Sequence, residues 1–164
     1  MHSLLRGILR SCFHRLARQV KFIESEISRQ DQPSAFSSLV AILDAQTASL
    51  RQHVPPSAPL PNFQDILDIT VYKGGTSVMA DVFMSRAQDT TPDSELFGFL
   101  LGTALQFVDD IQDAISDRRN HHHTVFTLNM CAGEACDPLI NRLLHLIDIS
   151  LHNRYRQTDS AKVR

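Results

Sequence analysis

Hydrophobic residues recur along this chain at the three- and four-residue spacing of an α-helix, and we find no segment with strand-like alternation. The resulting fold class is all-α, a helical bundle. Its 164 residues and 43% hydrophobic content fit a single domain over residues 1–156, with a polar tail at 157–164. The spacing predicts helices over about residues 3–30, 35–53, 62–83, 94–117, 125–130 and 138–156.

The boundaries of the third predicted helix carry clear local signals. The prolines within residues 54–61 exclude a helix there, because each one lacks an N–H donor and restricts the residue before it. Asn62 is a suitable N-cap, with Asp65 in the first turn. Farther along, Gly74-Gly75 predicts a kink or local break, because a glycine inside a helix costs roughly 1 kcal/mol relative to alanine.

The first 23 residues are basic and amphipathic. They contain no Asp or Glu, and apolar residues recur at helical spacing up to Ile23. We interpret this stretch as a first core helix whose outer face is basic. Two alternatives are an organelle transit peptide and an amphipathic segment that lies on a membrane surface. The bases are Arg6, Arg10, Arg15, Arg18 and Lys21.

Overall composition narrows the class of protein only slightly. The formal net charge is −2, so no strong field would attract nucleic acid. The cysteines, Cys12, Cys131 and Cys136, are few and odd in number, which favours a reducing compartment, and we expect a cytoplasmic protein. The gap between Cys131 and Cys136 is wider than the usual two-residue zinc knuckle. No apolar run approaches the ~20 residues needed to span a bilayer.

The helix predicted near residue 105 carries its acidic residues along one stripe. At about 100° per residue, Gln106, Asp110, Asp113 and Asp117 fall within about 60° of one another, and Asp109 lies beside them. Like charges at this spacing repel each other, and no Lys or Arg lies among them. Two interpretations stay open on these residues alone: a solvated helix face, or a row of hard oxygen ligands for Mg²⁺.

Two segments of the chain resemble a known family. Residues 102–113, GTALQFVDDIQD, resemble the second aspartate-rich motif of the trans-polyprenyl diphosphate synthases, which belong to the class I isoprenoid (terpene) synthases. Residues 72–77, YKGGTS, are similar to the helix-break segment whose lysine contacts diphosphate in that family, and residues 124–127 resemble the segment that follows the acidic motif. The resemblance covers about residues 62–130 and corresponds to the C-terminal half of the family's fold.

The resemblance implies a site for Mg²⁺ and a prenyl diphosphate. In the family, metal-assisted ionisation of an allylic diphosphate leads to prenyl transfer or terpene cyclisation. The metal ligands that it implies are Asp109, Asp110, Asp113 and Asp117. The diphosphate-binding residues that it implies are Lys73, Thr76, Ser77 and Gln106.

The chain departs from the family in its first half. No aspartate cluster precedes Asp109, and Asp65 with Asp68 is the nearest pair of aspartates, so the family's first aspartate-rich motif is missing. The resemblance therefore implies an isoprenoid-diphosphate-utilising enzyme, or a truncated copy of one that does not catalyse alone. We also expect the chain to self-associate or to join a partner synthase chain. The alternative function is a non-catalytic helical partner subunit. The three histidines at 121–123 are expected to form a solvated loop; a transition-metal site is the alternative.

Overall fold

The computed structural model describes residues 14–15, 17–26, 28–85 and 91–161, and side chains as far as Ile149. Helices dominate this part of the chain and no strand occurs in it, so the predicted all-α class is confirmed. The named elements are α2 (Pro33–Ser49), the short 3₁₀ helix η1 (Leu50–Gln52), α3 (Phe63–Ser85), α4 (Pro92–Gln112), α5 (Ala114–Arg119), α6 (Val125–Ala132) and α7 (Asp137–Ala161).

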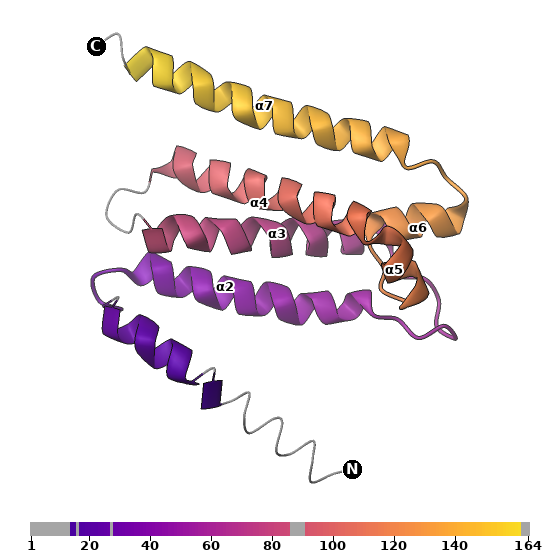
Figure 1. Ribbon diagram of the computed structural model, residues 1–164, viewed down its shortest axis with the longest axis horizontal. Coiled ribbons are helices and arrows are strands. Elements are labelled where there is room, and N and C mark those ends of the chain that lie inside the picture. Colours follow the sequence, from indigo (N-terminus) through magenta and orange to yellow (C-terminus); the bar gives the residue numbers. More distant parts are fainter. Residues whose placement is uncertain (1–13, 16, 27, 86–90, 162–164) are drawn as a thin grey trace.

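The long helices lie side by side, with α3 and α4 at the centre (Figure 1). Helix α2 packs on α3, and α7 runs along α4 on the other side (Figure 1). The core forms where α3, α4 and α6 meet, around Ile66, Ile69, Phe107 and Phe126. The rings of Phe107 and Phe126 meet edge to face, with centroids 6.3 Å apart. This core fixes the acid-rich end of α4 against α3.

Side-chain caps set the helix boundaries that the sequence predicts. The Asn62 Oδ1 accepts a hydrogen bond from the backbone N–H of Gln64 at 2.7 Å, so the predicted N-cap of α3 is confirmed. Thr124 begins α6 through a reciprocal capping box with Thr127. Gly133 ends α6 in the left-handed conformation, with φ of 73°.

Of the kink or local break predicted at Gly74-Gly75, the break does not occur, because α3 is helical throughout. These glycines instead allow α3 and α4 to approach closely. A Cβ added to Gly74 would lie 2.5 Å from the carbonyl oxygen of Gly102, and one added to Gly75 would strike the ring of Phe99. The Thr103 hydroxyl donates across this crossing to the backbone carbonyl of Val71 at 3.3 Å.

Two other predicted boundaries differ from the structure. The helix predicted over residues 94–117 is interrupted at Asp113, whose ψ of −1° ends α4 and turns the chain into α5. The last helix runs to Ala161, so most of the predicted polar tail at 157–164 is helical.

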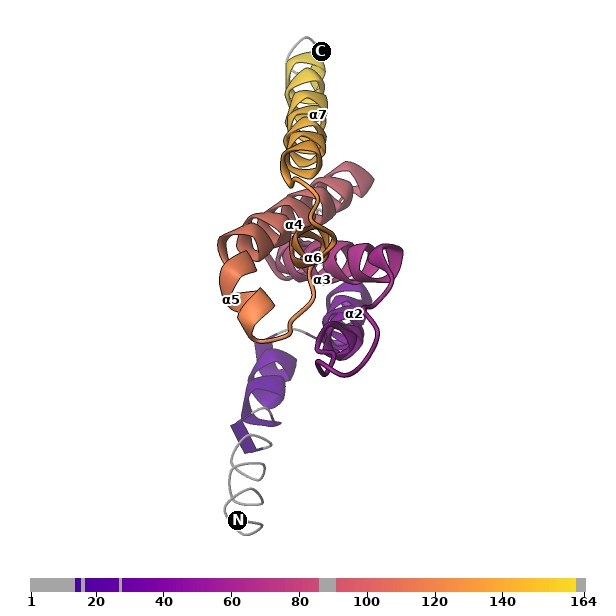
Figure 2. The ribbon, with the colours of Figure 1, turned by 90° about the vertical axis from the view of Figure 1, so that its right-hand side faces the viewer.

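The segment before α2 is a helix over residues 17–26 that extends away from the bundle (Figures 1 and 2). Its described side chains are exposed except that of Ile23, which is half-buried. The described part therefore does not behave as the predicted core helix; residues 3–13 of that prediction lie outside the described residues. No helix in the described part of the chain is long and apolar enough to cross a membrane.

Candidate functional site

The centre of the candidate site is the carboxyl group of Asp110, which points from α4 toward α3. The residue is only 4% exposed. Its Oδ1 accepts a hydrogen bond from Gln106 Nε2 at 2.7 Å, and Thr70 Oγ1 on α3 donates to its Oδ2 at 3.4 Å. Burial raises the pKa of Asp110, and the hydrogen bond from Gln106 and the charge of Lys73 only partly offset this rise.

Lys73 brings a positive charge to this carboxyl group from α3. It is half-buried and close enough to Asp110 to interact with it electrostatically. The structure therefore brings together three of the predicted site residues, Lys73, Gln106 and Asp110, from two helices. The Gly74–Gly102 crossing produces this arrangement, because the glycines lie within one helical turn of Lys73 and Gln106.

Thr76 and Ser77, the other predicted diphosphate-binding residues on α3, use their hydroxyls within their own helix. Thr76 is 1% exposed and donates to the backbone carbonyl of Tyr72 at 2.8 Å. Ser77 donates to the carbonyl of Lys73 at 2.8 Å. Such bonds to the preceding turn are common for buried Ser and Thr in helices. In this structure both hydroxyls therefore donate to backbone carbonyls of α3.

The remaining predicted carboxylates lie around Asp110 in different environments. Asp109 and Asp113 are exposed. Asp117 is half-buried and its Oδ1 lies 3.2 Å from His122 Nδ1, while its charge also affects Asp110. Among the described residues, no three His, Cys, Asp or Glu side chains are placed to hold a metal ion. The predicted four-residue ligand set is thus not assembled as a preformed cage.

A histidine cluster next to Asp117 was not predicted as part of this site. The rings of His53 and His122 stack with centroids 4.5 Å apart. The two histidines also form an isolated antiparallel bridge, which joins the end of η1 to the loop after α5. The run at 121–123 could be read from the sequence, but its pairing with His53 depends on the tertiary fold.

His123, the last histidine of this loop, is buried, whereas His121 is exposed. His123 is 9% exposed, and its backbone N–H donates to the Gln52 carbonyl at 2.7 Å. Burial lowers the pKa of His123, and the neighbouring histidines lower it further. The expected solvated loop is therefore correct for exposed His121 but wrong for His123.

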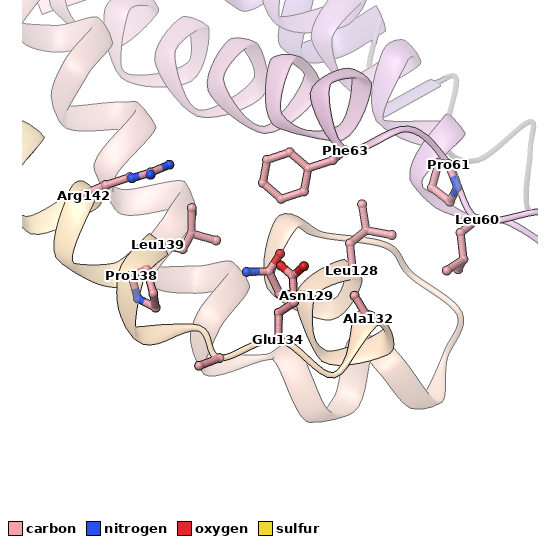
Figure 3. A pocket seen from close by; sticks show the side chains of 11 residues that line it. Leu60, Pro61, Phe63, Leu128, Asn129, Ala132, Glu134, Pro138, Leu139 and Arg142 are labelled. Atoms are coloured by element: carbon pink, nitrogen blue, oxygen red, sulfur yellow. The ribbon is translucent and has the colours of Figure 1, made fainter.

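A separate cavity of about 580 Å³ lies between the N-terminal ends of α3 and α7 and helix α6 (Figure 3). Phe63 projects into it, with Arg142 at one end and Glu134 and Asn129 opposite the ring (Figure 3). None of the predicted site residues lines it.

Cys136 is half-buried and Cys131 is exposed, and both are free thiols.

Comparisons of the chain with protein-family models, with curated proteins and with solved structures found no match. The function is therefore inferred from the fold and from the chemistry of the site.

Proposed function

We propose that the chain binds a prenyl diphosphate together with Mg²⁺ at the acid-rich end of α4, as one part of an assembly similar to a class I isoprenoid synthase. The observation that supports this most strongly is the burial of Asp110 between Gln106 and Thr70, near Lys73. Burying an ionisable carboxyl costs stability, and such groups are concentrated at functional sites.

The residues present fit a magnesium–diphosphate complex better than a free metal ion. Mg²⁺ keeps several waters and is usually held by one or two carboxylates together with phosphate oxygens. Asp110 and the exposed Asp113 would supply these carboxylates, with Asp109 and Asp117 beside them. Lys73 would neutralise the diphosphate, and Gln106 would orient Asp110. When bound, Mg²⁺ stabilises negative charge on the leaving diphosphate.

Isothermal titration calorimetry tests this proposal with inorganic pyrophosphate as the probe. The wild-type chain is expected to bind pyrophosphate when Mg²⁺ is present, and to bind either component alone much more weakly. Asp109→Asn combined with Asp113→Asn is expected to weaken the joint binding roughly 100-fold, because metal affinity depends on the carboxylates around the ion.

The matched control is Asp44→Asn combined with Asp81→Asn. It removes the same number of charges from exposed positions on α2 and α3. Equal binding by the control variant and the wild type would support the site. Equal binding by the Asp109/Asp113 variant and the wild type would show that the site is assigned to the wrong residues.

A second proposal, that the chain is a helical partner subunit, is favoured by an apolar stripe that α4 and α5 leave exposed. Its members Leu105, Val108 and Ile115 are 54%, 39% and 63% exposed. Leu105 and Val108 lie one turn apart on α4, and adjacent exposed apolar residues commonly mark an interface between proteins. We propose that this stripe pairs with a second copy of the chain, or with a synthase chain that supplies the missing carboxylates.

Sedimentation velocity tests the association. The wild-type chain is expected to form dimers or larger species, and Leu105→Gln with Ile115→Gln is expected to shift it toward monomer. The control is Leu43→Gln with Leu50→Gln on the α2 side, where the side chains are 64% and 68% exposed. A monomeric wild type, or a shift caused only by the α2-side pair, would contradict the role of the stripe.

A further inference from the structure

The helix over residues 17–26 remains unexplained by either proposed function. It projects from the bundle and leaves nearly all of its described side chains exposed (Figures 1 and 2). Val20 and Phe22 are 42% and 66% exposed, although both are apolar. A helix with this much exposed apolar surface is expected to meet another surface in its working state.

The charge of this segment indicates what that surface is. Arg15, Arg18 and Lys21 are exposed, and none of them forms an ion pair with another described residue. The first acidic residue, Glu24, is neutralised by Arg29, whose guanidinium lies 2.7 Å from its carboxylate. The part of the segment before Glu24 is therefore uniformly basic and complements a negatively charged surface.

Arg29 contacts both the projecting helix and the bundle. Its guanidinium carbon lies 4.9 Å from the centroid of the Phe36 ring on α2, so this side chain joins the end of the projecting helix to the bundle. Arg18 and Arg15 lie six and nine residues before Glu24, and both are exposed. The basic part is thus presented at a distance from the acid-rich end of α4.

One apolar stripe is also separated from the basic positions around the helix. At about 100° per residue, Val20 and Ile23 lie on one side, while Arg15, Arg18 and Lys21 lie on the opposite half together with Phe22. A basic polar face opposite an apolar stripe is typical of helices that lie in the interface of an anionic membrane. Their bases contact lipid headgroups while the apolar stripe enters the acyl boundary.

We propose that residues 14–23 bind the surface of an anionic lipid bilayer, with Val20 and Ile23 inserted and Arg15, Arg18 and Lys21 among the headgroups. This surface placement would hold the bundle next to the membrane. It is independent of diphosphate binding, because the two regions share no residue.

Vesicle flotation of the full-length chain tests the proposal. The wild type is expected to float with vesicles of phosphatidylcholine and phosphatidylglycerol, and not with phosphatidylcholine alone. Arg15→Gln, Arg18→Gln and Lys21→Gln together are expected to weaken binding roughly 100-fold, because each base contributes about a fivefold gain near an anionic surface. Raised salt is expected to weaken wild-type binding.

Two further variants distinguish the contribution of the basic residues from that of apolar insertion and from that of removing any exposed bases. Val20→Ser with Ile23→Ser is expected to lower binding while all bases remain. The control, Arg118→Gln with Arg119→Gln and Arg142→Gln, removes as many exposed bases from the bundle and is expected to bind like the wild type. Circular dichroism verifies that each variant is folded.

Three results would overturn the proposal. The first is no flotation of the wild type with anionic vesicles, and the second is equal flotation with neutral ones. The third is equal loss of binding in the control and in the Arg15/Arg18/Lys21 variant. If the wild type does not float and the Arg15/Arg18/Lys21 variant loses self-association in sedimentation, the helix contacts protein instead of lipid.

Discussion

Replacing Gly102 by alanine is expected to destabilise the protein by about 2 kcal/mol, although alanine is the better helix former. A Cβ at this position would overlap the backbone carbonyl oxygen of Gly74 and lie 2.9 Å from Val78 Cβ. The backbone of α3 cannot rotate away as a side chain can, so the two helices must separate. Denaturant unfolding followed by circular dichroism measures the change.

Gly98→Ala provides a matched control one turn earlier on α4. The atom that its Cβ would meet first is Val82 Cγ2 at 2.8 Å, which belongs to a side chain that can shift. The gain in helix propensity of about 1 kcal/mol offsets much of this contact, so we expect a stability near that of the wild type. Equal losses in Gly98→Ala and Gly102→Ala would contradict the close backbone crossing as the cause.

Asp110→Asn is expected to change stability and ligand binding in opposite directions. Without ligand, the variant should be more stable than the wild type at neutral pH, within the range of about 0.5–2 kcal/mol common for stabilising substitutions. Asparagine keeps an oxygen for the hydrogen bond from Gln106 and removes the buried charge. Binding of pyrophosphate with Mg²⁺ should fall roughly 100-fold. Thermal unfolding with and without both ligands measures the two effects.

The pH dependence of this difference follows from the raised pKa of Asp110. Below the unfolded-state value of 3.8 the carboxyl is protonated in both states, and the wild type bears no penalty. As the pH rises from that value through the higher folded-state pKa, the unfolded chain loses its proton first, so the folded state is progressively destabilised. The advantage of Asp110→Asn should therefore grow over this interval and stay constant above it. An advantage that shrinks with rising pH would contradict burial as the cause.

The sequence predicts most of the helices because the apolar spacing and the caps act locally. Asn62 caps α3 as predicted, and the proline-rich stretch at 54–61 is not helical. The break expected at Gly74-Gly75 was wrong because helix propensity describes an isolated helix. In the folded protein these glycines lie against Gly102 and Phe99 on α4, and that contact cannot be read from local sequence.

The candidate site was predictable in its residue types but not in their individual environments. Helical spacing places Gln106 and Asp110 on one face, and the structure joins them by a hydrogen bond. Helical spacing does not reveal that Asp113 ends α4, or that Asp110 alone of these acids is buried. The approach of His53 to His122 depends on contacts between segments that lie far apart in sequence.

We propose that a divalent ion and a diphosphate bind together at Asp110, next to Lys73. Paramagnetic broadening by Mn²⁺, which replaces Mg²⁺ in such sites, tests it most directly when nuclear magnetic resonance spectra are recorded with pyrophosphate. The strongest broadening is expected at the Gln106 side-chain amide and at the backbone amides of Asp110 and Asp113, while the signal of Ala45 on α2 stays sharp. Broadening centred on the histidines at 121–123, or no selective broadening, would contradict the claim.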